Sequence, residues 1–422
     1  MNDITRNTLL RQKAELESRL KEPYIERDTN LRADSIKDDL VRVIIGPRRA
    51  GKSFFAIHWL RKNVKFGYIN FDDEKLTTTK DFDELLAVID SLYDTPEFLL
   101  LDEIQNLDKW ELIANRLQRQ GRKLFITGSN SNLLSRELAT HLTGRHLQMT
   151  IFPFSFTELI TLQKENLTTV QMSEKLFWYA TYGGYPEPVI KNVDHKEYLS
   201  TLFDSILFKD IVKRYKIRKP NAIEDLAQFL LSNIGSEYSF RRLAELTKSK
   251  SVHTVQKYLG YLEDAFLLFS VKRFSFKTRE QLAFNKKIYA IDNGFITTES
   301  SKSTQSIGRL YENIVAVQLK KAEVSGKLNL YYWKSIQHEE VDFVLRQKGK
   351  ITRLIQVCYD LSNPDTKKRE IRSLIKAKQE LGCNELVILT NDYEALETIE
   401  WFGEKARITF LPLWKWLLND GL

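Results

Sequence analysis

Residues 46–53 place two glycines, Gly46 and Gly51, around a short turn that ends in Lys52 and Ser53. The run Gly-Pro-Arg-Arg-Ala-Gly-Lys-Ser fits G-x-x-x-x-G-K-[ST], the pattern of a loop whose backbone N–H groups cradle phosphates. At these positions the Lys52 ammonium would reach the β- and γ-phosphates, and the Ser53 hydroxyl would hold Mg²⁺. The pattern predicts ATP and Mg²⁺ as ligands, with the nucleotide bound by Gly46, Arg49, Ala50, Gly51, Lys52, Ser53 and Phe54.

Two acids, Asp102 and Glu103, follow the apolar run at 98–101. An apolar run that ends in acids is typical of a buried parallel strand that delivers its carboxylates to the carboxyl edge of a sheet. Beside a phosphate-binding loop, Asp102 would meet Mg²⁺ through water, and Glu103 would polarise the attacking water as a general base. The alternative is a strand end with a capping acid.

Three further polar residues could act on the γ-phosphate. Ser129 and Asn130 follow the apolar run at 123–127, where a sensor residue would touch the phosphate or the attacking water. Equally, they could cap a helix that begins at Asn132. Arg145 could stabilise transition-state charge within its own subunit or in a neighbour's site, and a surface ion pair is its alternative.

Strands and helices that alternate along the chain would position these groups. A helix is predicted directly after the phosphate-binding loop, at 53–60, and the run at 66–71 predicts a strand between the two motifs. An extra strand there is the arrangement of ATPases that carry a catalytic Glu beside the magnesium-binding Asp. The pattern predicts an α/β P-loop NTPase core with a parallel sheet over residues 38–160.

A basic block lies in the middle of the chain. Residues 211–290 contain 16 Lys+Arg and 7 Asp+Glu, although the net charge of the whole chain is only +8. Two predicted helices, at 240–246 and from 252 onward, flank a polar turn and favour a winged helix, with DNA as the partner. A solvated basic surface, a packing module or a protein contact are the alternatives. The DNA-binding candidates are Lys248, Lys250, His253 and Lys257.

The C-terminal third combines a periodic helix at 309–319 with strand-like runs at 328–333, 340–345 and 353–359. A helical Glu, a strand Asp and a further strand occur in this order in the PD-(D/E)XK nuclease core, which this region resembles. Those enzymes hold Mg²⁺ with acids and orient water with a Lys two residues beyond the last acid. The matching positions are Glu312, Asp342, Gln356 and Cys358, and the last two depart from the acid-x-Lys pattern. We expect a nuclease-like fold without nuclease chemistry, with a displaced Lys such as Lys334 as the alternative.

Length and composition limit the function classes. At 422 residues the chain has room for about three domains, and it contains no stretch approaching the ~18–20 apolar residues of a membrane span. Two cysteines, Cys358 and Cys383, suit a reducing cytoplasm, and six scattered histidines argue against a zinc site. We predict five segments: an N-terminal helix at 1–37, the P-loop core at 38–160, a helical lid at 161–220, a winged helix at 221–285 and the nuclease-like domain at 286–422.

Taken together, the chain resembles the archaeal and bacterial AAA-type P-loop ATPases with a C-terminal nuclease-like domain of unknown function. The resemblance spans nearly the whole chain. It implies an ATP-binding protein and suggests ATPase activity, but it names no substrate. It rests on the segments 46–53, 101–105, 127–131, 144–145, 153–156, 183–186, 288–294 and 340–343.

The leading functional hypothesis is a cytoplasmic Mg-ATPase that couples ATP binding and hydrolysis to DNA binding or remodelling. A homo-oligomer is also expected. One alternative is a nucleotide-controlled switch for a protein partner, and the other is an ATP-regulated nuclease.

Overall fold

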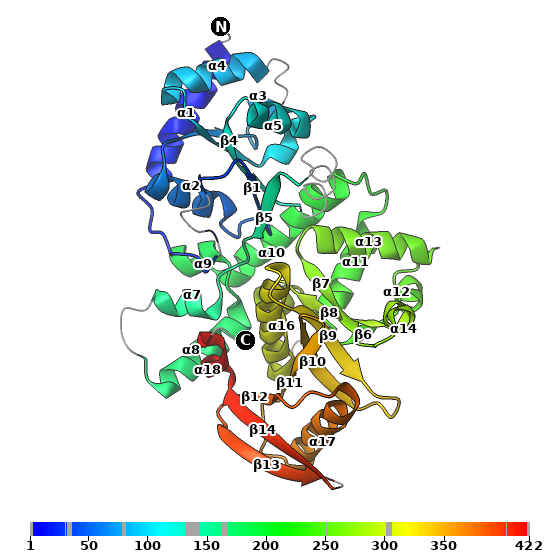
Figure 1. Ribbon diagram of the computed structural model, residues 1–422. Coiled ribbons are helices and arrows are strands. Elements are labelled where there is room, and N and C mark those ends of the chain that lie inside the picture. The colour runs from blue at the N-terminus through cyan, green and yellow to red at the C-terminus, as the bar shows by residue number, and fades with distance from the viewer. Residues whose placement is uncertain are drawn as a thin grey trace. The chain divides into compact units, whose positions relative to one another are not determined.

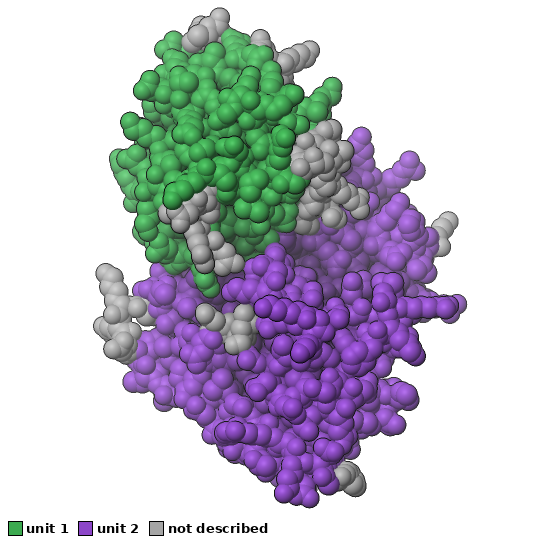
Figure 2. All heavy atoms as spheres, viewed as in Figure 1, with its two compact units in different colours: residues 1–152 green, residues 153–422 purple. Residues whose placement is uncertain are grey.

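The computed structural model describes residues 3–29, 31, 36–77, 82–130, 144–162, 167–249, 251–300, 306–401 and 403–419. The chain forms two compact units, residues 1–152 (unit 1) and residues 153–422 (unit 2), which Figure 2 shows in green and purple. Each unit contains one of the two sheets. None of the helices in these described ranges is both long and apolar enough to cross a membrane.

Unit 1 is built on five parallel strands in the order β2-β3-β4-β1-β5, of which Figure 1 labels β4, β1 and β5. Every residue of β1 and β3 is buried, as expected for strands covered on both faces. The strand predicted between the two motifs in the sequence is β2, which pairs with β3 at the edge of the sheet. Within the sheet, the strand that lies between β1 and β3 is β4. The bounds are β1 Val41–Ile45, β2 Phe66–Asn70, β3 Phe98–Asp102, β4 Lys123–Gly128 and β5 His146–Thr150.

The helices of unit 1 include the N-terminal one. Helix α1 lies beside α4 (Figure 1), and its Gln12 exchanges two 2.9 Å hydrogen bonds with the backbone of Asn70 on β2. Leu16 of α1 joins the core around Ile44 and Phe125. The predicted N-terminal helix is therefore a packed part of unit 1, and it ends at Arg19. The bounds are α1 Asp3–Arg19, α2 Lys52–Asn63, α3 Glu74–Thr77, α4 Phe82–Tyr93, the 3₁₀ helix η2 Ile104–Asn106 and α5 Trp110–Arg119.

Unit 2 begins with helices in the region predicted as a lid. Ser155 and Glu158 form a capping box at the start of α7, and Thr168 and Gln171 form another at α8. Helix α8 packs on α15 and α16, and α10 packs on α15, so both helices belong to the body of unit 2 and do not form a separate lid. The bounds are α7 Phe156–Thr161, α8 Thr169–Tyr182, α9 Pro186–Lys191, α10 His195–Ser205 and the π-helical η3 Ile206–Lys213.

A helical and stranded segment follows that contains both predicted helices of the basic block, α12 and α13. The strands order as β7-β8-β6, and both pairings are antiparallel. Val255, Leu259 and Leu262 form the buried face of α13, whereas Val252 is exposed. The bounds are α11 Pro220–Leu231, β6 Glu237–Tyr238, α12 Phe240–Leu246, α13 Val252–Asp264, β7 Leu268–Arg273, α14 Thr278–Ala283 and β8 Lys286–Ala290.

These three strands continue into the C-terminal part through one sheet of nine strands. The order is β13-β14-β12-β11-β10-β9-β7-β8-β6, and β7 pairs in parallel with β9 at Lys272 and Tyr331. The domain boundary predicted at residue 285 therefore cuts through a continuous sheet. The remaining bounds are α15 Asn293–Glu299, α16 Ile307–Val324, β9 Asn329–Lys334, β10 Glu340–Gln347, β11 Lys350–Val357, α17 Pro364–Leu381, β12 Leu386–Thr390, β13 Ala395–Trp401, β14 Glu404–Pro412 and α18 Leu413–Leu418.

Candidate functional site

The phosphate-binding loop turns between β1 and α2. A Cβ atom on Gly46 would lie 2.0 Å from the carbonyl oxygen of Ile151, so the loop passes there only with glycine. Gly51 has a φ of 93°, a left-handed conformation that glycine adopts without strain. Helix α2 begins directly after it, at Lys52, so the first amides of α2 face the loop. The backbone thus has the form that the sequence pattern requires.

Asp102 accepts several hydrogen bonds next to this loop. Its side chain is buried and accepts hydrogen bonds from the Ser53 hydroxyl at 2.7 Å and from the Tyr68 hydroxyl at 3.0 Å. The Thr127 hydroxyl, from β4, donates to the same carboxylate. Burial and the neighbouring charge of Glu103 raise the pKa of Asp102, and the three hydroxyl groups oppose that rise.

Mg²⁺ fits the donor set of Ser53 and Asp102. The hydroxyl and carboxylate oxygens are hard ligands, and Mg²⁺ in nucleotide sites takes one or two protein ligands together with phosphates and water. A cation beside Asp102 would offset the cost of ionising this buried carboxyl, which its raised pKa indicates. Bound there, Mg²⁺ would neutralise charge on the β- and γ-phosphates.

Glu103 lies in a strained conformation at the end of β3. Its φ of 50° and ψ of 44° are left-handed, which is uncommon for a residue with a side chain. Its backbone N–H donates to Thr127 Oγ1 at 3.0 Å, and its carboxylate accepts from Gln105 Nε2 at 2.5 Å. The same Thr127 hydroxyl therefore donates to the Asp102 carboxylate and accepts from the Glu103 backbone.

Lys52 completes this arrangement from the loop side. Its buried ammonium donates to the Pro47 carbonyl at 3.0 Å and lies 3.7 Å from Glu103 Oε1. Burial by itself would raise the pKa of Glu103, but the charges of Lys52 and Arg48 and the hydrogen bonds from Gln105 and Ser129 outweigh it, so the pKa lies below its usual range. Glu103 is therefore ionised, as a general base must be.

The other predicted residues of the ATP site take different positions. Asn130 and Ser129 are buried directly after β4, and Ser129 Oγ lies 3.5 Å from Gln105 Nε2. The alternative role of these residues, as a cap for a helix from Asn132, concerns positions outside the described residues. Phe54 packs with His58 at 4.5 Å between ring centroids, and Arg49 is exposed with a left-handed φ of 63°.

Arg145 lies at the amino ends of the strands of unit 1, whereas the phosphate-binding loop lies at their carboxyl ends. Its carbonyl accepts a hydrogen bond from Val41, the first residue of β1, whereas the phosphate-binding loop follows the last residue of β1. A strand of this length spans about 16 Å, which is farther than an arginine side chain extends. The structure therefore argues against a role for the exposed Arg145 in its own site.

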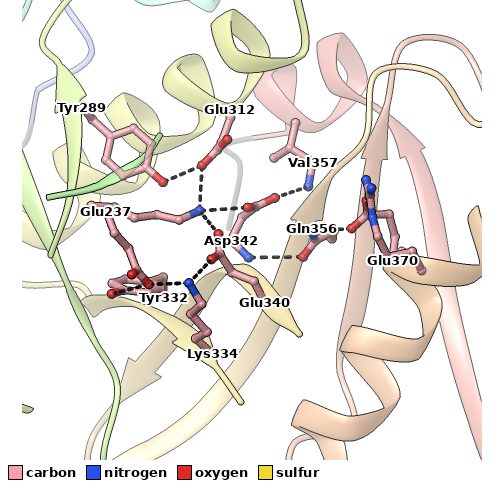
Figure 3. Close-up of polar contacts among 12 residues, drawn as sticks. Glu237, Tyr289, Glu312, Tyr332, Lys334, Glu340, Asp342, Gln356, Val357 and Glu370 are labelled. Atoms are coloured by element: carbon pink, nitrogen blue, oxygen red, sulfur yellow. Dashed lines mark hydrogen bonds and ion pairs between the residues drawn. The ribbon is translucent and has the colours of Figure 1, made fainter. Parts of the chain in front are cut away.

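A second polar cluster lies in unit 2 at the predicted degenerate nuclease site. Figure 3 shows Glu312, Glu340 and Asp342 pointing toward a common centre. Lys287 of β8 supplies the ammonium there: its Nζ lies 3.1 Å from Glu312 Oε1, 3.1 Å from Asp342 Oδ1 and 2.6 Å from Glu340 Oε1. Burial by itself would lower the pKa of Lys287, but Glu312 and the other acids raise it well above its usual range.

The two departures from the nuclease pattern, Gln356 and Cys358, form hydrogen bonds of their own. Gln356 accepts from the backbone N–H of Asp342 at 3.2 Å and donates to Glu370 at 2.6 Å (Figure 3). The thiol of Cys358 donates to the Asp360 carbonyl at 3.3 Å, and burial raises the pKa of Cys358 to about 12. Neither residue therefore replaces an acid or an ammonium of a nuclease site.

Lys334, the alternative for a displaced nuclease lysine, lies beside the cluster. It pairs with Glu237 at 3.0 Å and with Glu340 at 3.6 Å, so the central position belongs to Lys287. Throughout the described ranges, no three His, Cys, Asp or Glu side chains are arranged to hold a metal ion. The Mg²⁺ that a nuclease would require does not fit these residues, because the ammonium lies between the acids.

The DNA-binding candidates lie at the junction of α12 and α13. Lys248, His253 and Lys257 are exposed, and Lys250 lies outside the described residues. Lys248 occupies the turn with a left-handed φ of 48°. Lys287, which counts toward the charge of the basic block, is buried and adds nothing to its surface.

Sequence reasoning missed several residues that contact the candidate groups. The sequence predicts Thr127 and Tyr68 only as strand residues, although both donate hydrogen bonds to Asp102. A hydroxyl at the carboxyl end of a strand next to the magnesium-binding acid is the signal that could have identified Thr127. Gln105 and Lys287 had no comparable signal, since one acts from a 3₁₀ turn and the other from a distant strand.

Three protein-family models match successive segments of the chain. The AAA domain family matches residues 38–160, and two domains of unknown function, DUF8612 and DUF4143, match residues 173–306 and 307–416. Among solved structures, the Walker-type ATPase PABY2304 of Pyrococcus abyssi is 14% identical, with a TM-score of 0.44 over 66% of this chain and 96% of that one. AMPPCP-bound DnaA from Aquifex aeolicus is 13% identical, with a TM-score of 0.26 over 57% of this chain and 89% of that one.

Two curated relatives match most of the chain. The uncharacterized protein MJ1544 of Methanocaldococcus jannaschii is 34% identical over 96% of this chain and 93% of its own length. An uncharacterized protein of Haemophilus influenzae is 30% identical over 76% of this chain and 83% of its own length. The chain therefore belongs to the family of MJ1544, and it carries an AAA-type P-loop ATPase domain at residues 38–160.

Proposed function

We propose that this protein is a Mg-dependent ATP hydrolase of the AAA type in which Glu103 is the general base. The observation that carries the proposal is the Thr127 hydroxyl, which contacts both the Asp102 carboxylate and the Glu103 backbone N–H. This contact links the carboxylate that would hold Mg²⁺ to the backbone of the residue that would activate water, which supports the proposal. Asp102 also contacts Ser53, and Glu103 lies 3.7 Å from Lys52.

Each group then has a separate role in hydrolysis. The loop amides and Lys52 would bind the phosphates, while Ser53 and Asp102 would hold Mg²⁺. Glu103, whose pKa is held low mainly by Lys52 against the effect of burial, would accept a proton from the attacking water. Asn130, buried at the end of β4, would contact the γ-phosphate or that water.

The test is steady-state ATP hydrolysis by the full chain with Mg²⁺. Lys52→Ala should weaken nucleotide binding because it removes the charge that faces the phosphates. Glu103→Gln should retain ATP binding but stop hydrolysis, because an amide does not take up the proton. Equal turnover by the parent protein and Glu103→Gln would disprove the assignment of Glu103.

We further propose that ATP hydrolysis is coupled to DNA binding through α12 and α13. The element order α11, β6, α12, α13, β7, β8, with β8 between β6 and β7, supports the reading of this segment as a winged helix. Lys248, His253 and Lys257 are exposed around the start of α13. Turnover measured with single-stranded, duplex and branched DNA is the test. Stimulation by DNA supports the proposal, whereas turnover that changes only with a protein partner favours a nucleotide-controlled switch.

A further inference from the structure

In the charged cluster of unit 2, the single ammonium of Lys287 contacts three acidic side chains. An ammonium group has three N–H donors, and the three nearest carboxylate oxygens come from Glu312 on α16 and from Glu340 and Asp342 on β10. Lys287 is 1% exposed, so the protein supplies its environment. A buried ammonium requires such partners, because an uncompensated buried charge is strongly destabilising.

The carboxylates are also held by groups other than Lys287. The Tyr289 hydroxyl donates to Glu312 Oε1 at 2.7 Å, and the Val357 backbone N–H donates to Asp342 Oδ2 at 3.0 Å (Figure 3). Lys334 lies 3.6 Å from the second oxygen of Glu340. These contacts orient the acids toward the centre without requiring the ammonium, so the arrangement is suited to retain its geometry when Lys287 is changed.

Charge and ligand chemistry identify what else could occupy the centre. Burial and the charge of Glu312 raise the pKa of Asp342 to about 7, and even a partly protonated Asp342 leaves more acid charge than the single ammonium of Lys287 balances. The oxygens of these acids are the ligands that hard divalent cations prefer. The oxygens lie 2.6 to 3.1 Å from Nζ, so they would need to move inward to reach the ~2.0–2.2 Å that Mg²⁺ or Mn²⁺ requires. The ammonium and a divalent cation are thus mutually exclusive.

We propose that Lys287 serves as a built-in cation that takes the place of a divalent metal ion, and that its removal converts the cluster into a divalent-cation site. In the parent protein the ammonium joins β8 to α16 and β10, so that the strands near the basic block are tied to the C-terminal α/β part. This inference concerns unit 2 alone and does not depend on ATP hydrolysis.

The experiment measures Mn²⁺ binding to the EDTA-treated full chain without nucleotide, by calorimetry and by electron paramagnetic resonance of free Mn²⁺. Lys287→Met removes the charge and retains most of the side-chain volume. Adding Glu340→Gln to it gives a second variant with one fewer uncompensated carboxylate, which protects the test against misfolding. Lys334→Met is the matched control, because it removes a neighbouring ammonium that does not lie at the centre.

Lys287→Met, or its combination with Glu340→Gln, should bind one more Mn²⁺ than the parent protein and should unfold at a higher temperature with Mn²⁺ than without it. Adding Asp342→Asn should remove both effects, and Lys334→Met should show neither. The proposal is overturned if a folded Lys287→Met protein gains no Mn²⁺, or if Asp342→Asn removes Mn²⁺ from the parent protein. Failure of both Lys287 variants to fold even with Mn²⁺ would overturn it as well, because the cation should replace the ammonium.

Discussion

Gln105 Nε2 lies 2.5 Å from Glu103 Oε2, while the other oxygen of the same carboxylate faces Lys52. Gln105 follows Glu103 by two residues, and the 3₁₀ helix η2 brings its amide back onto the acid. One oxygen of the proposed base is therefore held by a neutral donor and the other lies near a cation. Both interactions favour the ionised form of Glu103.

Replacing Gln105 should change the pH dependence of hydrolysis. Gln105→Leu removes a hydrogen bond to a charged group, typically about 1.5–3 kcal/mol, so kcat should fall by roughly 10- to 100-fold. Because this bond lowers the pKa of Glu103, the acidic limb of the kcat profile should move to higher pH. The measurement is kcat and KM between pH 5 and 9. Asn106→Leu, at an exposed position of the same turn, is the control, and an unchanged profile would rule out this role for Gln105.

Thr127→Val should raise the Mg²⁺ concentration that hydrolysis requires. The substitution removes the hydroxyl that donates to Asp102 and leaves the Glu103 N–H without this acceptor, at a cost of about 1–3 kcal/mol. The hydroxyl lowers the pKa of Asp102, so its loss makes the carboxylate harder to ionise. A Mg²⁺ titration of turnover is the measurement. Thr127→Ser should restore the parent behaviour, and a shift that serine does not reverse would indicate a packing effect.

Arg145→Ala should lower turnover by roughly 10³-fold or more, with ATP affinity nearly intact, if Arg145 completes a neighbour's site. Arg145 directly precedes β5, at the end of the sheet away from the phosphate-binding loop. Its side chain could therefore approach a γ-phosphate only in a neighbouring subunit. Mixing Arg145→Ala with Lys52→Ala should then restore some activity, since each chain supplies what the other lacks. No recovery in mixtures shown to co-assemble would remove Arg145 from the catalytic residues.

Neutralising Lys248 and Lys257 should weaken DNA binding and reduce its salt dependence. Each lost phosphate contact on duplex DNA removes about 0.9 from the slope of log affinity against log salt. Fluorescence anisotropy with a labelled duplex at several salt concentrations measures both quantities. Lys348→Ala with Lys350→Ala is the matched control, because Lys348 in the turn after β10 and Lys350 at the start of β11 are both exposed. Equal losses in both pairs would indicate a nonspecific charge effect.

The free energy of unfolding should decrease as pH rises from 4 to 6 because of Asp292. Burial raises the pKa of this carboxyl from 3.8 to about 6, although the Gly184 and Gly294 N–H groups oppose the rise. In this window the folded chain binds more protons than the unfolded chain, so the free energy of unfolding decreases as pH rises, by about 3 kcal/mol in total. Urea unfolding from pH 4 to 8 should show a smaller decrease for Asp292→Asn. The exposed Asp392→Asn should retain the parent slope.

The sequence by itself determined the phosphate-binding loop and the acid pair near it, because these parts are local. The phosphate-binding loop, the strand before it and the helix after it lie within about twenty residues, and the acid pair is one dipeptide at a strand end. In a parallel sheet such strand ends must meet at one edge, so proximity of Ser53 and Asp102 follows from the pattern. The order of the strands in the sheet cannot be derived from the sequence pattern. That order places β4 beside β3 and brings Thr127 to Asp102.

Only the tertiary structure decided how unit 2 is assembled. Pairing of β7 with β9 joins segments about sixty residues apart, and no local pattern specifies that register. The same pairing brings Lys287, one member of a basic block, into a cluster of acids from α16 and β10. In the sequence, Lys287 is one of many basic residues in this block, and nothing distinguishes it from those on the surface. Burial among three carboxylates depends on distant backbone contacts, which is why the sequence predicted a degenerate site there but not the ammonium that fills it.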